Sequence, residues 1–222
     1  MIERFIHQLA VELPAPGETA AEARVRLAER FPRTALRRMT HLGMLLGASS
    51  HNFALGAEDA VVYASTYAET RALEDFLRSF PAASPLLFQT SIHPGGIQQV
   101  LIGRQQPLAR LWPLAGCRRL VEQAFLTALL EPAPRVAILA GEERGTWLLE
   151  QGVASGEAFA VGLLLGRESE GRVGRVAFVP SGASDGPVPT LMELARAVAA
   201  GSGMKWSGAG GEWTVEFDRL SA

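Results

Sequence analysis

Runs of apolar residues alternate along the chain with charged, helix-favouring segments. Apolar runs bounded by turn-forming residues predict strands at 5–12, 60–65, 108–114, 135–140, 158–165, 175–179 and 212–217. Segments rich in Ala, Glu and Arg, or with apolar residues three and four positions apart, predict helices at 18–30, 34–46, 69–80, 91–102, 117–131 and 190–200. This alternation predicts a layered α/β fold with a mixed sheet.

Three segments carry more specific expectations. Residues 135–140 are almost continuously apolar, which is typical of a strand covered on both faces. In 34–46 the apolar residues share one helix face, and Gly47 is expected to end that helix. A Gly- and Glu-rich stretch between 158–165 and 175–179 predicts a hairpin that joins these two strands.

The length and composition predict one domain, residues 1–222. The chain has 222 residues, 48% of them hydrophobic, which is ample for a core. A net charge of −2, from 21 basic and 23 acidic residues, lacks the positive footprint of a nucleic-acid-binding protein. The N-terminal residues lack the layout of a signal peptide, and the uncharged stretch 39–57 is too polar to cross a bilayer. The sequence therefore predicts a soluble, cytoplasmic protein.

The common catalytic and cofactor motifs are missing from the sequence or incomplete. Gly-Ala-Ser-Asp-Gly at 182–186 matches the Gly-x-Ser-x-Gly elbow of α/β-hydrolases, but Pro187 and Pro189 interrupt the helix that must follow the serine. The triad histidine of that fold follows the serine, whereas every histidine here precedes it. A glycine-rich surface turn is the simpler interpretation. There is no phosphate-binding loop and no histidine pair with metal-ligand spacing, so neither a cofactor nor a metal is predicted.

Cys117 is the candidate nucleophile of the sequence. It is the one cysteine of the chain, so an intramolecular disulfide and a thiolate metal cluster are both excluded. It stands where a predicted helix begins, and a helix N-terminus stabilises a thiolate. The competing interpretation is a small buried residue, which is what most single cysteines are.

Five segments, in this order and spacing, resemble the N-terminal half of the β-ketoacyl synthases, the condensing enzymes of thiolase fold. They are 88–96 (Phe-Gln-Thr-Ser-Ile-His-Pro-Gly-Gly), 103–107 (Gly-Arg-Gln-Gln-Pro), 115–117 (Ala-Gly-Cys), 137–141 (Ala-Ile-Leu-Ala-Gly) and 156–165 (Gly-Glu-Ala-Phe-Ala-Val-Gly-Leu-Leu-Leu). Segment 103–107 is similar to the Gly-x-x-Gly-Pro turn of the family, with Gln106 in place of the second glycine. Segment 115–117 falls near the Thr-Ala-Cys nucleophile of the family, which makes Cys117 the implied nucleophile position.

The resemblance covers residues 1–165 and implies a fold. It implies a thiolase-like half-fold of α-β-α type, in which helices flank a mixed five-stranded sheet. Residues 166–222 match no part of the second half of a synthase and are expected to form a short C-terminal extension of strand and helix. A tail of this length resembles that of half-length synthase-like proteins in aryl polyene clusters, which act as chain-length-factor-like partners.

The resemblance also implies that this chain cannot catalyse the family's condensation reaction by itself. The family needs, besides the cysteine, two histidines (or a histidine and an asparagine) from the second half, which stabilise the enolate and the oxyanion. No histidine follows Cys117 here. Arg118 and Arg119 stand where the family has small residues beside the acyl tunnel. Burying an unpaired arginine costs several kcal/mol, so at least one of the two is expected to face solvent or a carboxylate.

The function implied is that of a catalytically incomplete ketosynthase-like subunit. Its partner would be a full-length ketosynthase, or a second copy of itself, and an acyl carrier protein would take part indirectly, in aryl polyene, polyketide or fatty-acid-type biosynthesis. In the family the strand before the nucleophile lies at the two-fold dimer interface, which implies interface roles for Leu108, Leu111, Trp112 and Leu114. Three alternatives are open. Trp112 could be a core residue of a single domain. The chain could be a small acyltransferase or thioesterase that depends on Cys117, or a self-associating homodimer with a scaffold role.

Overall fold

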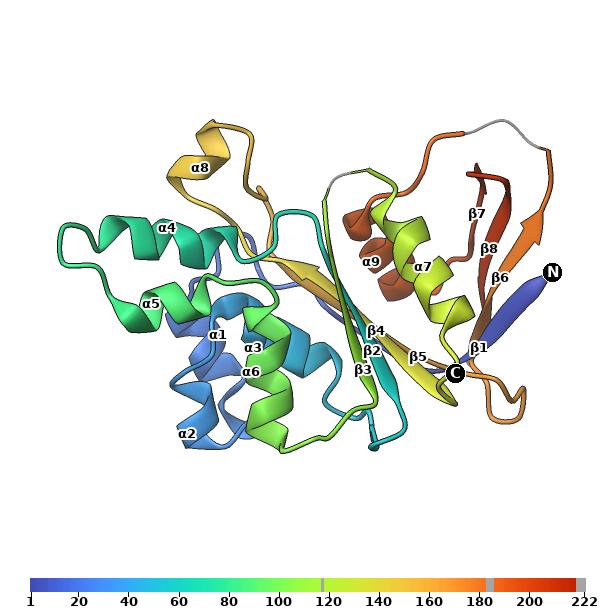
Figure 1. Ribbon diagram of the computed structural model, residues 1–222, viewed down its shortest axis with the longest axis horizontal. Coiled ribbons are helices and arrows are strands. Elements are labelled where there is room, and N and C mark those ends of the chain that lie inside the picture. The colour runs from blue at the N-terminus through green and yellow to red at the C-terminus, as the bar shows by residue number, and fades with distance from the viewer. Residues whose placement is uncertain (117, 183–185, 219–222) are drawn as a thin grey trace.

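The computed structural model describes residues 1–116, 118–182 and 186–218, and its strands form one mixed sheet with helices on both faces (Figure 1). The sheet has eight strands in the order β3-β2-β4-β5-β1-β6-β8-β7. β2, β3 and β4 run parallel, and every other neighbouring pair is antiparallel. The strand bounds are β1 Ile2–Glu12, β2 Ala60–Ser65, β3 Arg110–Ala115, β4 Arg135–Glu142, β5 Phe159–Gly166, β6 Gly174–Pro180, β7 Met204–Gly208 and β8 Gly211–Phe217.

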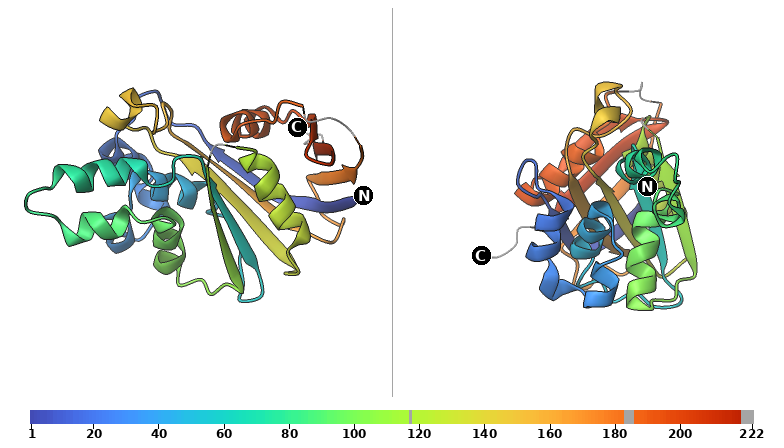
Figure 2. Two further views of the ribbon diagram at one scale, coloured as in Figure 1. Left: turned by 45° about the horizontal axis from the view of Figure 1, so that its top comes forward. Right: turned by 90° about the vertical axis from the view of Figure 1, so that its left-hand side faces the viewer.

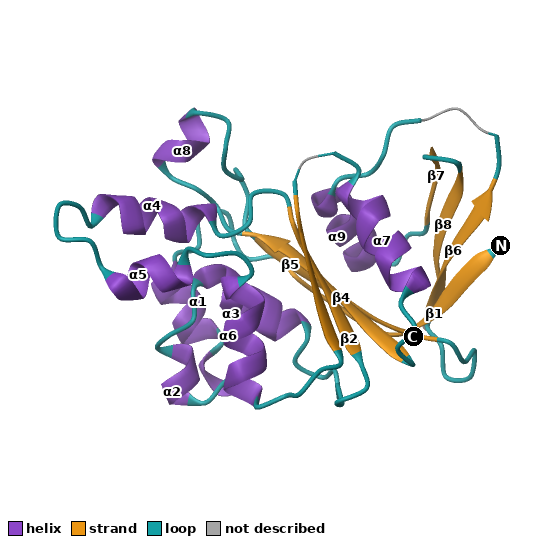
Figure 3. Ribbon diagram, in the orientation of Figure 1, coloured by secondary structure: helices purple, strands orange, loops and turns teal. Residues whose placement is uncertain are grey.

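The helices fall into two groups on opposite sides of the sheet (Figure 3). Their bounds are α1 Ala20–Arg26, α2 Arg33–Leu36, α3 His41–Ser49, α4 Thr70–Arg78, α5 Pro85–Thr90, α6 Gly95–Arg104, α7 Leu120–Leu130, α8 Trp147–Glu150 and α9 Leu191–Ala200, with a 3-10 turn at Ala28–Arg30. α3 covers one face together with α6, and α7 and α9 cover the other. α4 and α5 project from the body of the molecule (Figure 2). Within the described residues, none of these helices is long and apolar enough to cross a membrane.

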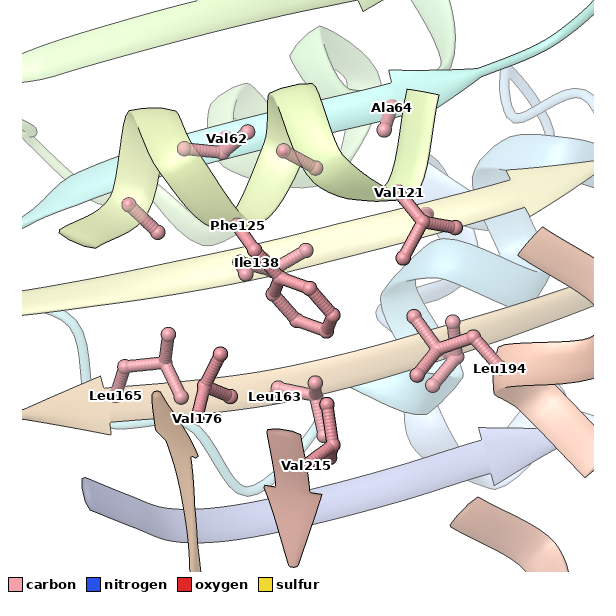
Figure 4. Close-up of a cluster of buried hydrophobic side chains, with 14 of the residues drawn as sticks. Val62, Ala64, Val121, Phe125, Ile138, Leu163, Leu165, Val176, Leu194 and Val215 are labelled. Atoms are coloured by element: carbon pink, nitrogen blue, oxygen red, sulfur yellow. The ribbon is translucent and has the colours of Figure 1, made fainter. Parts of the chain in front are cut away.

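Each central strand sends alternate side chains into two separate hydrophobic cores, as the period of two in a strand requires. In β2, Val62 and Ala64 face α7, whereas Val61 and Tyr63 face α3. Phe125 of α7 is fully buried at the centre of the first core, above Ile138 (Figure 4). The apolar run predicted for a strand covered on both faces is confirmed, because β4 is buried from Val136 to Glu142.

The helix predicted at 34–46 is two helices. α2 ends at Leu36 and α3 begins at His41, because the Thr40 hydroxyl accepts a hydrogen bond from Gly43 N (3.0 Å) and caps a new helix. Gly47 does not end the helix, contrary to expectation. It lies inside α3, where a Cβ would stand 2.6 Å from the Phe31 ring, so glycine is required there for close packing.

The C-terminal extension is larger and better integrated than predicted. The five-stranded part β3-β2-β4-β5-β1 is present, but β6, β8 and β7 continue the same sheet, so the sheet has eight strands rather than five. The expected hairpin between β5 and β6 is wrong, since β1 lies between them and pairs with both. β7 was not predicted, and it joins the core by stacking Trp206 on Trp213 of β8, with ring centroids 5.8 Å apart.

This extension covers the α7 face of the sheet. α9 contacts β1, β5 and α7, and it contributes Leu191, Leu194 and Val198 to the core beneath. C-terminal residues of this chain therefore help to cover the α7 face of the sheet.

Candidate partner interface and the first turn of α7

β3, the strand expected at a dimer interface, is an edge strand of the sheet. It pairs in parallel with β2 from Ala60↔Arg110 to Ser65↔Ala115. Among the described residues no strand pairs with its other side. Pro113 lies in the middle of β3, and proline is tolerated in a sheet at such an edge. The fold thus leaves one side of β3 open to another chain.

Three of the four predicted interface residues belong largely to the cores. Leu108 and Leu111 pack against the core under α3, and Leu114 packs against the core under α7. Trp112 differs, since 42% of its surface is exposed and it belongs to neither core. The interpretation of Trp112 as a core residue is therefore wrong, and an interface role for these four residues stays a prediction.

Glu131 holds the exposed Trp112 in place. The Trp112 indole Nε1 donates to Glu131 Oε2 (2.6 Å), and the Arg110 guanidinium donates to Glu131 Oε1 (2.7 Å). Burial alone would raise the pKa of Glu131. The hydrogen bonds from Trp112, Ala133 N and Arg110 outweigh burial, so the pKa lies below its ordinary value. A large aromatic side chain that is both exposed and fixed in orientation suits an interface anchor.

The buried Arg4 fixes the backbone around Glu131, beside the edge strand β3. Its guanidinium donates to the carbonyl oxygens of Glu131, Ala133 and Pro134, where α7 ends. A cation is favourable at a helix C-terminus because the exposed carbonyls there carry partial negative charge. Arg4 therefore fixes the turn from which Glu131 reaches β3. Neither Arg4 nor Glu131 carries a sequence signal, because both contacts join residues far apart in the chain.

The first turn of α7 follows the expected nucleophile position. Cys117 itself lies outside the described residues, as do Ser184 and Asp185 of the Gly-x-Ser-x-Gly motif. Arg119 precedes the helix in the left-handed region (φ 57°), and its Nε donates to Glu122 Oε2 at 2.5 Å. Arg118 is exposed. The expectation that an arginine of this pair faces solvent or a carboxylate is confirmed by both residues.

The C-terminal extension reaches this same turn. Glu122 is buried, and besides Arg119 it accepts a hydrogen bond from the Trp206 indole Nε1 (3.0 Å) of β7. Gly208 of β7 lies so close that a Cβ would stand 1.8 Å from Glu122 Oε1. The side of α7 that faces β7 is thus filled by an ion pair and an indole of this chain. Sequence reasoning missed Glu122, Trp206 and Gly208 because β7 was not predicted.

Two of the histidines contact glutamate side chains on the opposite face of the sheet. His93 Nδ1 contacts Glu69 Oε2 (2.9 Å) beside Tyr63, and His41 Nε2 contacts Glu18 Oε1 (3.2 Å) at the start of α3. His51 is exposed after α3. These three histidines lie near α3 and α6, on the face of the sheet opposite α7 and the expected nucleophile position.

Comparison with known proteins finds similarity in fold to solved structures. No family model matches the sequence, and no curated protein matches it. A chain in the complex of a ketosynthase with its chain length factor from Xenorhabdus doucetiae superposes with a TM-score of 0.66 at 16% identity, over 97% of this chain and 100% of that one. The chain has a ketosynthase-like fold. The ishigamide ketosynthase/chain length factor is similar too, with a TM-score of 0.57 at 15% identity over 83% of this chain and 69% of that one.

The thiolase-like fold implied by the sequence resemblance is confirmed by these superpositions. The first of them spans nearly the whole of both chains, including this chain's β6, β7 and β8 region. The ketosynthase-like fold of this chain thus extends beyond residues 1–165, to which the sequence resemblance was limited.

Proposed function

We propose that this chain is a catalytically incomplete ketosynthase-like subunit that pairs with an active, full-length ketosynthase through the open edge of β3. Its role would be that of a chain length factor, in aryl polyene or related polyketide or fatty-acid-type biosynthesis on carrier-protein-bound chains. The observation that carries the proposal is Trp112, which is exposed on an edge strand paired on one side only, among the described residues, and is fixed by Glu131.

The chemistry of the chain supports an incomplete site. Decarboxylative condensation needs basic or hydrogen-bonding side chains around the nucleophile, and no histidine follows residue 93 in this sequence. The carboxylate in the first turn of α7 is occupied by Arg119 and Trp206. Such a chain contributes surface and shape to an assembly in which the partner supplies the reacting groups.

The comparisons support the choice of partner. Both similar structures are described as containing a ketosynthase and a chain length factor, and the first as a complex of the two. The present chain matches one chain of that complex over its full length. A partner of ketosynthase chemistry is therefore the simplest occupant of the β3 edge.

Co-purification tests this assembly. A tagged copy of this chain is expressed with a full-length ketosynthase from the same source, and the mass of the eluted complex is measured by light scattering. We expect a one-to-one complex, lost in Trp112→Arg and retained in Trp147→Arg, which replaces a similarly exposed tryptophan on α8. A chain that stays alone at micromolar concentration, or equal loss in both variants, would show the proposal to be wrong.

Covalent labelling tests the alternative of a Cys117-dependent acyltransferase or thioesterase. An activated thiolate reacts with iodoacetamide at neutral pH much faster than a free thiol. We expect an intact mass that changes no faster than the mass of a model thiol peptide. Rapid labelling, together with hydrolysis of an acyl thioester that is lost in Cys117→Ala, would favour the enzyme over the partner subunit.

A further inference from the structure

The structure has a cleft of about 750 Å³. α4, α5 and α8, which contribute to its lining, lie at the end of the molecule opposite β6, β7 and β8 (Figure 1). The walls of the cleft come from the residues that lead into α1, from the turn between α2 and α3, from α4 and α5, and from 143–150. No residue of β3 or α7 lines it, so it is separate from the proposed partner edge. Its volume lies in the range of small-molecule sites, about 300 to 1,000 Å³.

The cleft has an excess of positive charge. Five arginines line it: Arg24, Arg37, Arg38, Arg71 and Arg144. Two of them have partners within the protein, since Arg24 donates to the carbonyl oxygens of Leu36 and Met39, and Arg71 pairs with Asp75 (2.5 Å).

The guanidinium groups of Arg37, Arg38 and Arg144 make no hydrogen bond or ion pair with any described residue. All three residues are exposed, and a guanidinium group can donate two parallel hydrogen bonds to a carboxylate or phosphate.

The acidic groups of the cleft do not cancel this charge. Glu18 is engaged by Arg26 (2.7 Å) and His41, and Asp75 is engaged by Arg71. Glu143 also lines the cleft, and it accepts a hydrogen bond from Leu42 N (3.1 Å) at the start of α3. Burial raises the pKa of Glu143 to about 7, which makes its carboxyl partly neutral near neutral pH. Glu150 is exposed on α8 and is the remaining acidic lining residue.

One wall of the cleft is apolar. Leu86 and Leu87 of α5 and Leu149 of α8 line it, and 63% of the Leu86 surface is exposed. An exposed leucine beside unpaired arginines favours a ligand with two parts. The anionic group would meet the arginines, and an attached chain would cover the leucines.

We propose that this cleft binds an anionic group carried on an apolar chain, with Arg37, Arg38 and Arg144 as its charged contacts. The anionic group is a phosphate ester or a carboxylate, and the two share the same recognition by guanidinium groups. This site does not depend on the proposed partner, because its walls and the β3 edge share no residue.

Isothermal titration calorimetry with octyl phosphate and with octanoate tests the site. We expect saturable binding of at least one of the two, weakened tenfold or more in Arg37→Ala/Arg38→Ala and again in Arg144→Ala. The control is Arg33→Ala/Arg118→Ala, which removes the same charge from exposed arginines outside the cleft and is expected to change the affinity by less than twofold. Tighter binding of octyl phosphate assigns a phosphate ester, and tighter binding of octanoate assigns a carboxylate.

Three outcomes would overturn the proposal. They are the absence of saturable binding of both probes, equal weakening in the control variant, and binding of octyltrimethylammonium as strong as that of the anions. Inorganic phosphate that binds as tightly as octyl phosphate would refute the apolar part of the site. Circular dichroism of each variant shows whether the fold is retained, so that a loss of binding can be assigned to the arginines.

Discussion

The indole Nε1 of Trp206 donates a hydrogen bond to Glu122 Oε1 across 3.0 Å and so joins the C-terminal extension to the first turn of α7. Glu122 also pairs with Arg119, which stands just before that helix. A carboxylate in the first turn is favourable because the helix N-terminus carries partial positive charge. The extension therefore does more than lengthen the sheet. Its β7 also packs against the first turn of α7, the helix that follows the expected nucleophile position.

Removing this hydrogen bond should lower the stability of the protein. Trp206→Phe keeps most of the apolar surface but leaves Glu122 with one partner fewer, and a lost hydrogen bond to a buried charged group costs about 1–3 kcal/mol. Urea unfolding followed by circular dichroism measures the change. Trp147→Phe is the control, because Trp147 is partly exposed on α8 and is expected to change stability by less than about 0.5 kcal/mol. Equal effects would mean that the contact with Glu122 contributes nothing measurable.

The close approach of α3 to β5 depends on Gly162. A Cβ at this position would stand 2.4 Å from the Ser49 carbonyl oxygen and 3.1 Å from the Phe53 ring. Gly162→Ala should therefore push α3 away from the sheet and cost about 1–3 kcal/mol. Gly182→Ala is the matched control, since nothing lies within 4 Å of its added Cβ. Unchanged unfolding of Gly162→Ala would mean that the backbone shifts there without cost.

Among the residues of α7, Phe125 should be the one whose truncation lowers the stability most. Its ring is fully buried and lies 6.3 Å from the Trp206 ring and 6.2 Å from the Trp213 ring, centroid to centroid. Phe125→Ala should lower the free energy of unfolding by about 3–5 kcal/mol, because it removes the ring and leaves a cavity. Leu126→Ala on the same helix is the control, with a side chain that is 40% exposed. A loss in Phe125→Ala no greater than in the control would contradict the packing described.

The contribution of Glu143 to stability should fall as the pH rises, whereas the lowered pKa of buried His41 acts in the opposite direction. The pKa of Glu143 is raised from 4.5 to about 7 by burial, opposed by the Leu42 N–H and Arg71 and assisted by Asp75 and Glu74. The folded state then holds this proton more tightly than the unfolded state. The contribution is full below about pH 4.5 and is lost as the pH rises toward 7.

Glu143→Gln cannot ionise and keeps an acceptor for Leu42 N, so its stability should fall less between about pH 5 and about pH 8 than that of the unchanged protein. Urea unfolding at intermediate pH values measures this difference, which is at most about 3 kcal/mol for a shift of this size. Glu150→Gln, exposed on the same cleft, should leave the pH profile as it is. Parallel profiles for Glu143→Gln and the unchanged protein would contradict the assignment.

Local patterns predicted the strands that are buried on both faces, and long-range contacts decided the rest. The apolar runs 60–64 in β2 and 136–141 in β4 can be recognised from the sequence without knowing which strands pair with them. β7 is short and holds Lys205, Ser207 and Gly208, so its strand conformation depends on pairing with β8. The hairpin expected between β5 and β6 failed for a similar reason, because β1 comes from the other end of the chain.

For the candidate site too, the sequence indicated some residues but not the long-range contacts between them. Trp112 could be singled out from the sequence, as an aromatic residue in a strand that resembles a family interface. The contact that fixes it could not, since Glu131 follows α7 and lies nineteen positions further along the chain. The cleft arginines also escaped notice, because arginine supplies 20 of the 21 basic residues and no short segment stands out.

The last prediction separates a vestigial nucleophile position from a working one. Cys117→Ala should leave product formation by the assembled system nearly unchanged, because no histidine of this chain follows residue 117 and the partner is expected to supply the reacting groups. Trp112→Arg should abolish product formation by blocking assembly at the β3 edge, while Glu131 can still pair with the new arginine and hold the strand. Product formation is measured with the reconstituted ketosynthase and carrier protein, and assembly by light scattering on the same samples. If Cys117→Ala stops product formation while the complex stays intact, the cysteine of this chain takes part in the chemistry and the partner role is wrong.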